Sequence, residues 1–308
     1  MSPMQATVLG GTGYLGSVVV RTLLARGWRV RVGARRPERA GAGGDAAPAM
    51  RVRCDVRDEG SLERAFAGSR AVVNAVGLYA EAGDETFEAV HVDGAARAAR
   101  AASRSGVERL VHVSGIGASD ASPSSYVRAR AAGERAVRAA FARACIVRPS
   151  VLFGPADAFL GSIDALTRYS PVFPLFGRGT TRMQPVHVDD VAAAIAAVLS
   201  KPGGQLELLE LGGKRVLTYR QVVEAVLASR GRRRVLLPVP FAVWMLQAKL
   251  LSAWPNAPLS EHQVILMRSD NVADGALAGL ADVGVTPADL EALLPQILDA
   301  PRAEAAQR

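Results

Sequence analysis

The sequence predicts an α/β protein with a doubly wound parallel sheet of the Rossmann type and a smaller C-terminal lobe. Through the first half of the 308-residue chain, short runs of aliphatic and β-branched residues alternate with helical patterns. Such alternation is typical of a parallel sheet that is covered by helices on both faces. A glycine-rich segment, residues 10–16, also separates the first expected strand from the first expected helix. Six strands are expected before Pro149, which suits a doubly wound sheet.

Local residues justify each element of this sheet. Val30 and Val32 favour a strand, because β-branched side chains pack well on a pleated surface. Gly27 and Gly106 mark the ends of helices, and Ser61 is expected to cap a helix that begins there. The expected strands are 6–9, 28–33, 50–54, 71–76, 109–114 and 145–148, and the expected helices are 14–26, 61–67, 86–105 and 126–141.

The regular alternation weakens after Pro149, where residues 154–179 predict loops with one helix. We expect residues 183–200, with a strand at 185–188 and a helix at 190–199, to return to the sheet domain of residues 1–150. The smaller lobe then comprises residues 151–182 and 201–308. Its expected features are a strand at 207–211, a helix at 219–230, a basic run at 232–234, an apolar stretch at 235–254 and a frayed tail at 301–308.

Composition narrows the classes of function. Hydrophobic residues make up 49% of the chain and charged residues 21%, which argues against a disordered protein. The 37 Lys and Arg exceed the 29 Asp and Glu and give a net charge of +8. Because the basic residues are scattered and aromatic residues are only 5%, we expect no nucleic-acid binding. A basic face toward anionic lipid or an acidic partner protein is favoured instead.

Cysteine and targeting patterns predict a cytoplasmic protein. Cys54 and Cys145 lie in short apolar runs, and we interpret them as buried thiols in a reducing compartment. Their spacing is not that of a metal site, so no metal is expected. The first strand begins almost at once, so no signal peptide is expected. No clean run of about 18 apolar residues predicts a transmembrane helix.

Glycines 10, 13 and 16 form a GxxGxxG pattern between a strand and a helix, the context in which such a pattern binds a dinucleotide. Gly10 permits a tight turn, Gly13 lets the backbone approach a pyrophosphate, and Gly16 lets the helix pack closely on the sheet. The helix N-terminus adds N–H groups and a partial positive charge. The predicted contacts with the dinucleotide here are Gly10, Thr12, Gly13, Tyr14, Leu15 and Gly16.

The end of the second strand predicts which nucleotide binds. In sheets that bind NAD(H), an Asp or Glu at this position hydrogen-bonds to the ribose 2′-hydroxyl. This chain instead has Arg35 and Arg36, whose guanidinium groups pair well with a 2′-phosphate. We therefore expect NADP(H) in preference to NAD(H). The ends of the third and fourth strands are expected to add the contacts Asp55, Val56, Ala75, Val76 and Gly77.

These motifs resemble the extended and atypical branch of the short-chain dehydrogenase/reductase superfamily. The resemblance covers residues 6–199 and includes the glycine loop, residues 111–114, Tyr126 and residues 186–191. Within this superfamily the chain most resembles the nucleotide-binding accessory subunits of respiratory complex I and their bacterial relatives. The segments that carry this closer resemblance are 112–118, 122–128, 184–186, 210–213 and 270–272.

In this superfamily, hydride transfer uses a Ser, a Tyr and a Lys, with the Tyr and Lys four residues apart on a helix. The resemblance places Ser114 and Tyr126 at the first two positions, but Arg130 stands where the family has its lysine. Arginine keeps the positive charge, yet its planar fork is not equivalent to an ammonium group. The resemblance implies that Tyr126 and Arg130 contact the nucleotide. The resemblance is compatible both with an active enzyme and with a protein whose hydride transfer is weak.

Other polar residues have structural interpretations. We expect His187 to be a buried core histidine and Asp189 or Asp190 to cap a helix, with a role in shaping the cleft as the alternative. His91 lies in the middle of an expected helix and is not predicted to be catalytic.

The apolar stretch near the C-terminus has two interpretations. It contains Trp244 and Trp254 and follows the basic run at 232–234. Apolar helices with tryptophans and a basic flank lie well in a membrane interface, and a core helix of the smaller lobe is the alternative. The resemblance favours the membrane, because it implies a place beside the quinone-bearing arm of a membrane complex.

The leading prediction is an NADP(H)-binding protein in which the dinucleotide is a structural ligand and hydride transfer is weak or absent. One alternative is an NADPH-dependent reductase or epimerase that uses Tyr126, in quinone or lipid metabolism. A nucleotide-sensing regulator is another. The expected partners are complex I subunits or the membrane surface, with a peripheral location on its inner face. The substrate is left open.

Overall fold

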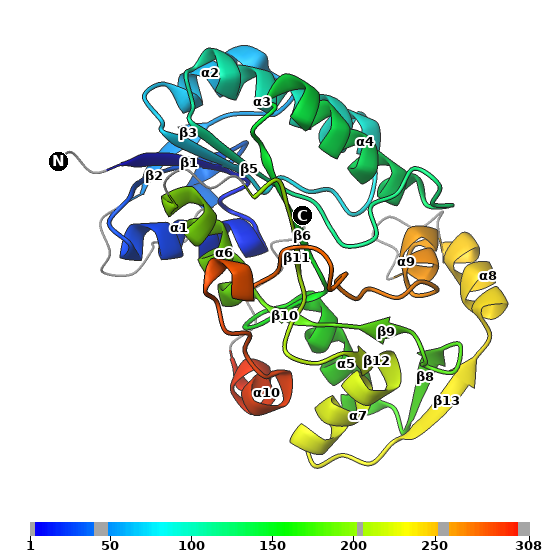
Figure 1. Cartoon of the computed structure of the whole chain (residues 1–308). Coiled ribbons are helices and arrows are strands. Elements are labelled where there is room, and N and C mark those ends of the chain that lie inside the picture. The colour runs from blue at the N-terminus through cyan, green and yellow to red at the C-terminus, as the bar shows by residue number, and fades with distance from the viewer. Residues whose placement is uncertain (1–3, 40–48, 202–205, 252–258, 301–308) are drawn as a thin grey trace. The chain divides into compact units, whose positions relative to one another are not determined.

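The computed structural model of the chain describes residues 4–39, 49–201, 206–251 and 259–300. Its elements form two compact units, which Figure 1 shows together. The first unit comprises residues 1–149, 188–211 and 275–286, and the second comprises residues 150–187, 212–274 and 287–308.

The first unit is built on a parallel sheet. Among the described residues this sheet has seven strands in the order β11-β6-β5-β4-β1-β2-β3. The strands are β1 (Gln5–Leu9), β2 (Arg29–Ala34), β3 (Met50–Arg53), β4 (Ala71–Asn74), β5 (Arg109–Val113), β6 (Cys145–Pro149) and β11 (Leu208–Leu211). The order reverses between β1 and β4, and doubly wound sheets bind nucleotides at such a point. The predicted fold class is confirmed.

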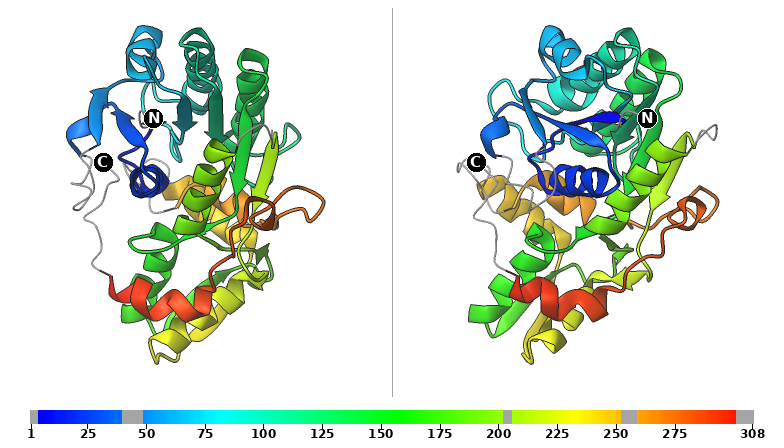
Figure 2. Two further views of the ribbon diagram at one scale, coloured as in Figure 1. Left: turned by 60° about the vertical axis from the view of Figure 1, so that its left-hand side comes forward. Right: turned by 90° about the vertical axis from the view of Figure 1, so that its left-hand side faces the viewer.

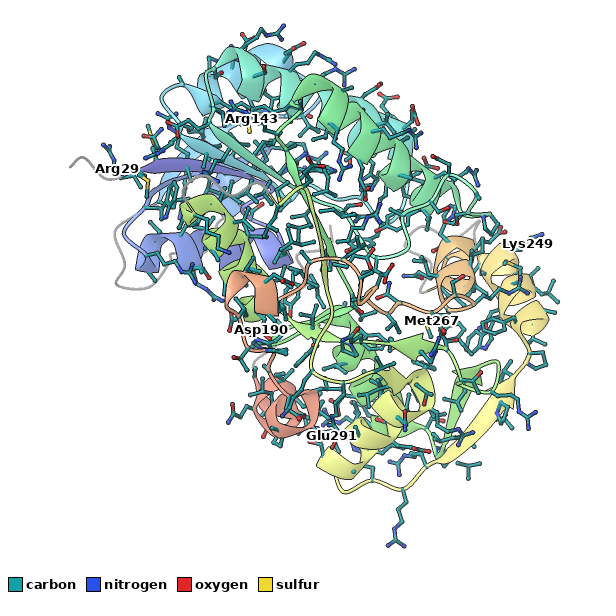
Figure 3. The ribbon with its side chains drawn as sticks, viewed as in Figure 1. Arg29, Arg143, Asp190, Lys249, Met267 and Glu291 are labelled. Atoms are coloured by element: carbon teal, nitrogen blue, oxygen red, sulfur yellow. The ribbon has the colours of Figure 1, made fainter. Side chains whose placement is uncertain are left out.

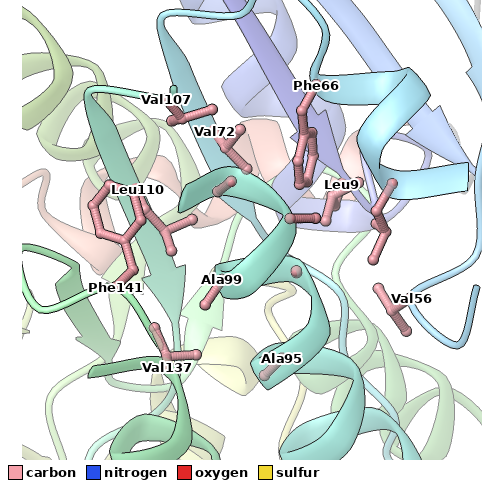
Figure 4. Close-up of a cluster of buried hydrophobic side chains, with 14 of the residues drawn as sticks. Leu9, Val56, Phe66, Val72, Ala95, Ala99, Val107, Leu110, Val137 and Phe141 are labelled. Carbon is pink, nitrogen blue, oxygen red and sulfur yellow. The ribbon is translucent and has the colours of Figure 1, made fainter. Parts of the chain in front are cut away.

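Helices cover both faces of this sheet, as Figures 1 and 2 show. On one face lie α2 (Glu59–Phe66), α3 (Ala95–Arg104) and α4 (Ser125–Ala140), and on the other lie α1 (Tyr14–Ala25) and α6 (Val188–Ser200). The short helices η1 (Pro37–Arg39), η2 (Glu88–Gly94) and η3 (Ala281–Val283) complete the unit. A buried cluster fills the space under α2, α3 and α4 and includes Leu9, Phe66, Val72, Leu110 and Phe141 (Figure 4).

The sequence predictions for one strand and one helix cap of this unit are wrong. The strand expected at 207–211 in the smaller lobe is the edge strand β11 of the main sheet, where it runs parallel to β6. The reason is burial, since Leu209 and Leu211 lose all contact with solvent there. Asp58, rather than Ser61, caps α2, because its carboxylate accepts a hydrogen bond from the Ser61 N–H at 3.2 Å.

The helix expected at 86–105 is divided into the π-helical turn η2 and the α-helix α3. Backbones approach closely at this turn, since a Cβ placed on Gly133 of α4 would lie only 2.0 Å from the carbonyl oxygen of His91. Asp189 and Asp190 do not cap a helix but lie in the first turn of α6 (Figure 3 labels Asp190). Carboxylates there still interact favourably with the helix dipole.

The second unit contains short strand pairs and a separate core. Its strands are β7 (Leu152–Phe153), β8 (Val172–Phe176), β9 (Arg182–Met183), β10 (Val186–His187), β12 (Leu217–Thr218) and β13 (Val235–Val239), paired as β10-β7, β12-β9 and β13-β8. Its helices are α5 (Ala158–Tyr169), α7 (Tyr219–Ser229), α8 (Phe241–Leu251), α9 (Glu261–Leu266) and α10 (Leu290–Asp299). Phe153, Leu175, Met183 and Val222 lie in its core.

The segment 183–200, expected to return to the sheet as a whole, is divided between the units. Its strand β10 pairs with β7 in the second unit, and its helix α6 packs against α1 in the first. His187 is buried, as expected for a core histidine, and the centre of its ring lies 5.1 Å from the centre of the Phe153 ring.

The apolar stretch at 235–254 forms strand β13 and helix α8. Trp244 is only partly exposed. Its Nε1–H donates to the Leu175 carbonyl at 3.1 Å, and the centre of its ring lies 4.4 Å from the centre of the Phe176 ring. Trp254 and the tail at 301–308 lie outside the described residues. None of the helices in the described ranges has the length and hydropathy needed to cross a bilayer.

Candidate functional site

The glycine loop forms a tight bridge between β1 and α1. Gly10 has φ +71°, and its N–H donates to the Gly33 carbonyl of β2 at 2.9 Å. A Cβ on Gly16 would lie 2.1 Å from the Gly10 carbonyl oxygen, so only glycine fits at this position. Gly13 is the N-cap of α1, and no side chain caps this helix. The loop therefore presents backbone N–H groups at a helix N-terminus, which suits a pyrophosphate.

The other predicted loop residues surround this turn. Thr12 lies in the turn, half-buried, and Tyr14 begins α1. Leu15 is buried, like the other core residues of α1.

The ends of β2 and β3 carry charged side chains. Arg35 and Arg36 follow β2 and are exposed, and Arg35 forms an ion pair with Glu85. Asp55 follows β3, and Arg57 binds its carboxylate with both Nε and Nη2, the shortest distance being 2.8 Å. This hydrogen bonding lowers the pKa of Asp55 below its ordinary value. Val56 beside it is buried.

The end of β4 lies next to the glycine loop. The Ala75 N–H donates to the Leu9 carbonyl at 3.1 Å, and a Cβ on Gly10 would lie 2.8 Å from the Ala75 carbonyl oxygen. The side chain of Asn74 accepts a hydrogen bond from the Val76 N–H at 3.2 Å. Gly77 follows and is exposed. The structure thus brings 75–77 and the glycine loop to one edge of the sheet.

Tyr126 and Arg130 form a pair on α4. The Arg130 Nε–H donates to the Tyr126 hydroxyl at 2.7 Å, and the guanidinium carbon lies 4.9 Å from the centre of the tyrosine ring. Ser114, at the end of β5, is buried, and its hydroxyl has no hydrogen-bond partner among the described residues. Arg130 also reaches the segment that follows β4, since a Cβ built on Gly77 would lie 3.8 Å from the Arg130 Nη2.

Three aromatic residues that the sequence did not single out as functional surround Tyr126. Tyr79 stacks on its ring at 5.9 Å, and Phe87 and His91 meet it edge-on at 5.4 and 5.6 Å. The His91 Nε2 lies 2.9 Å from the Leu78 carbonyl oxygen. The sequence places all three residues after the segment 74–77, which is predicted to contact the nucleotide. Their spacing, however, does not indicate that they pack around the same residue.

This enclosure shifts the titration of the site. Burial raises the pKa of Tyr126 to about 12 and outweighs the opposing effect of Arg130. Burial together with Arg130 lowers the pKa of His91 to about 4 and that of His112 to about 3. At neutral pH the tyrosine is therefore a neutral phenol and both histidines are uncharged.

The residues at this edge of the first unit fit a dinucleotide. The close backbone approach at Gly16, the uncapped start of α1 and the unsatisfied hydroxyl of Ser114 are the features that a bound ligand would use. No group of three or more His, Cys, Asp or Glu side chains in the described part of the chain is placed to hold a metal ion.

Comparison with protein families agrees with this geometry. Residues 6–212 match the family described as the NAD dependent epimerase/dehydratase family. The chain belongs to this family. The predicted relation to extended short-chain dehydrogenases/reductases is confirmed, and members of the family bind NAD or NADP.

The relatives of this family member include complex I subunits. The chain is similar to the mitochondrial NADH dehydrogenase [ubiquinone] 1 alpha subcomplex subunit 9 of Arabidopsis thaliana, with 36% identity over 79% of this chain and 62% of the relative. It thus spans less than two thirds of that relative's length. With the same subunit of Mus musculus it shares 32% identity over 94% of this chain and 78% of the relative. The predicted resemblance to complex I accessory subunits is confirmed.

Other relatives are enzymes. A ceramide reductase of Caulobacter vibrioides is 33% identical over 81% of this chain and 78% of its own length. Among solved structures, the NADP(H) complex of a Citrobacter sp. triphenylmethane reductase superposes with a TM-score of 0.75. The match covers 96% of this chain and all of that structure, at 19% identity. At this identity the likeness supports the fold alone.

Proposed function

We propose that this family member binds NADP(H) mainly as a structural ligand and transfers hydride weakly or not at all. The observation that carries this proposal is the state of Tyr126. Its hydroxyl is bound by Arg130 at 2.7 Å, and burial raises its pKa to about 12. An effective general acid has a pKa near the working pH, so a phenol in this state is poorly suited to give up its proton.

The residues proposed to hold the nucleotide are those of the sheet edge. The pyrophosphate side would be contacted by Gly10, Thr12, Gly13, Tyr14, Leu15 and Gly16. The 2′-phosphate would be bound by Arg35 and Arg36, and the adenine by Asp55 and Val56. The remaining part of the nucleotide would be contacted by Ala75, Val76, Gly77, Tyr126 and Arg130. A bound nicotinamide would supply or accept a hydride. Arg130 would hold the nicotinamide ribose and keep the phenol of Tyr126 in place, while the surrounding rings exclude water.

A ligand that binds only the folded state stabilises it. At a thousandfold excess over Kd the gain is about 4 kcal/mol. A nucleotide that contacts the ends of several strands would therefore stabilise the whole first unit without any chemical step.

The proposal is tested by loading the protein with NADPH and mixing it with a short-chain ubiquinone or an aldehyde. We expect the nucleotide fluorescence to persist for hours. A rapid loss that disappears in Tyr126→Phe, while Gly161→Ala behaves as the wild type, would contradict the proposal. Gly161 is a suitable control because, apart from its chain neighbours and the backbone of its own helix, no heavy atom lies within 4 Å of a Cβ built there.

The second candidate is an NADPH-dependent reductase or epimerase, and the observation in its favour is the unpartnered hydroxyl of Ser114. In an active enzyme, this group would orient a substrate carbonyl beside Tyr126, and reductases occur among the relatives. Arg130→Lys restores the lysine of the active family members. A large gain in turnover would indicate a decayed enzyme, and a large loss from a measurable rate would show that Arg130 itself serves the reaction.

We also propose complex I subunits as partners, since relatives bear that name, and an anionic membrane as the surface beside them. On α8, Val243, Leu246 and Leu250 are at least half exposed and share one face of the helix. Lys249 on the same helix is exposed (Figure 3). Trp244 lies on the opposite face and fastens α8 to β8.

Co-sedimentation with vesicles of phosphatidylcholine and phosphatidylglycerol tests the membrane proposal. We expect binding to the anionic vesicles that is lost in the double variant Leu246→Ser, Leu250→Ser. Val216→Ser, which also removes an exposed apolar side chain of the second unit, should leave binding unchanged. Absence of binding by the wild type would overturn the proposal.

A further inference from the structure

We propose that Glu85 limits the preference of this protein for NADP(H) over NAD(H) by holding Arg35, the residue placed to bind the 2′-phosphate. The inference rests on the proposed NADP(H) site and adds to it a residue that opposes the phosphate. Its basis is the ion pair between Arg35 and Glu85, which joins residues 50 positions apart in the chain.

The ion pair spans the edge of the sheet at which nucleotides bind. Arg35 directly follows β2, and Glu85 lies in the segment that follows β4. In the sheet, β1 lies between β4 and β2. A contact between the residues after β2 and β4 must therefore cross the carboxyl end of β1, where the glycine loop begins. The pair is thus next to the predicted path of the adenosine half of the nucleotide.

The backbone around Glu85 holds its carboxylate in this position. Ala82 and Glu85 exchange two backbone hydrogen bonds, at 3.1 and 3.0 Å, which close a tight turn. The Glu81 carboxylate accepts a hydrogen bond from the Phe87 N–H at 2.7 Å and fastens the end of the turn. The side chain of Glu85 is 30% exposed and that of Arg35 is 56% exposed. The ion pair is therefore accessible to a competing anion.

A 2′-phosphate and the Glu85 carboxylate compete for the same guanidinium group. Charge-assisted bonds from Arg to phosphate are strong and often bidentate, and Glu85 already holds Arg35 Nη1, one of the donors that such a pair would use. If both anions bind Arg35 together, they repel each other at short range. The 2′-hydroxyl of NAD(H) carries no charge and does not need Arg35. Glu85 therefore weakens the binding of NADP(H) and leaves that of NAD(H) nearly unchanged.

The neighbouring carboxylate of Asp55 also interacts with the charge of Arg35, but its hydrogen bonds go to Arg57. Its oxygens are bound by Arg57 at 2.8 to 3.2 Å. Asp84, beside Glu85 in the turn, is exposed. It offers a matched control for the removal of one negative charge.

The test is calorimetric titration of nucleotide-free protein with NADP⁺ and with NAD⁺. We expect Glu85→Gln to tighten NADP⁺ binding by about fivefold, which corresponds to about 1 kcal/mol, the upper end of the range for exposed ion pairs. NAD⁺ binding should change by less than about twofold, and Asp84→Asn should change the ratio of the two affinities far less. In an Arg35→Ala background, Glu85→Gln should have no effect on that ratio.

The outcomes separate this inference from the proposed function. If the wild-type protein binds neither nucleotide, the proposed NADP(H) site itself is wrong. If it binds NADP⁺ and Glu85→Gln leaves the affinity ratio unchanged, only the role of Glu85 is overturned. An equal effect of Asp84→Asn would also overturn it, because the effect would then reflect net charge rather than the ion pair.

Discussion

Replacing Gly16 by alanine should separate α1 from the glycine loop. A Cβ at this position would lie 2.1 Å from the Gly10 carbonyl oxygen, 2.8 Å from its carbonyl carbon and 3.0 Å from the Gly11 Cα. All three are backbone atoms, so no side chain can rotate away. The helix must move by about 1 Å, and overpacking of this kind costs about 1–3 kcal/mol. A displacement of that size at a binding loop can also cost about a hundredfold in function.

Differential scanning calorimetry and nucleotide titration check this prediction. We expect the melting temperature of Gly16→Ala to fall by roughly 3–10 °C and nucleotide affinity to fall at least tenfold. In α5, a Cβ built on Gly161 has no heavy atom within 4 Å apart from its chain neighbours and its own helix backbone. The free energy of unfolding of Gly161→Ala should therefore equal that of the wild type or exceed it by up to about 1 kcal/mol. A stable Gly16→Ala protein with normal nucleotide binding would refute the reasoning.

Three further predictions follow from buried groups. Arg148→Met should destabilise the first unit by about 3–5 kcal/mol in urea, because it removes the guanidinium group that binds both Glu134 and Glu210, only 8% and 7% exposed. Adding Glu134→Gln and Glu210→Gln should recover most of this loss, and no recovery would contradict the account. Burial raises the pKa of Asp157 to about 6, above the unfolded value of 3.8. Stability from this group should therefore be present below about pH 4 and be lost as pH rises through 6, and Asp157→Asn should abolish that slope. Burial also raises the pKa of the Cys145 thiol to about 12, so a thiol reagent at pH 8 should label it only after unfolding; fast labelling of the native protein would contradict this.

The main sheet could be predicted because its signals are local. Val30, Val32 and the glycines that end helices each report on their own segment, and together they imply a doubly wound order. The position of β11 could not be predicted in this way. Its four residues pair with β6, more than fifty positions away, and short buried strands carry no mark of the sheet that they join.

The π-helical turn at 88–94 was missed for a related reason. A helical pattern over 86–105 does not distinguish an α-helix from a π-helical turn. The close approach of His91 to Gly133 at this turn joins two different helices, so the local sequence does not reveal it. The cap of α2 shows a smaller error. Asp58 and Ser61 are both good caps, and only the backbone angles at Asp58 decide between them.

At the candidate site, the sequence singled out residues that belong to motifs and passed over residues that do not. The structure places the glycine loop and residues 75–77 at one edge of the sheet. Tyr126 and Arg130 pair as their spacing of one helical turn implies. Glu85 and Tyr79 lie in a connecting segment, where neither periodicity nor charge pattern shows which residue each will meet. Their contacts with Arg35 and Tyr126 depend on the fold alone.

The most direct test of the central claim is to denature the purified protein and identify any released nucleotide by mass. Its exchange with free nucleotide is timed beforehand on the native protein. The account predicts a nearly stoichiometric NADP(H) that exchanges over hours. An empty site, a rapidly exchanging nucleotide or bound NAD(H) would contradict the claim that NADP(H) is a structural ligand of this protein.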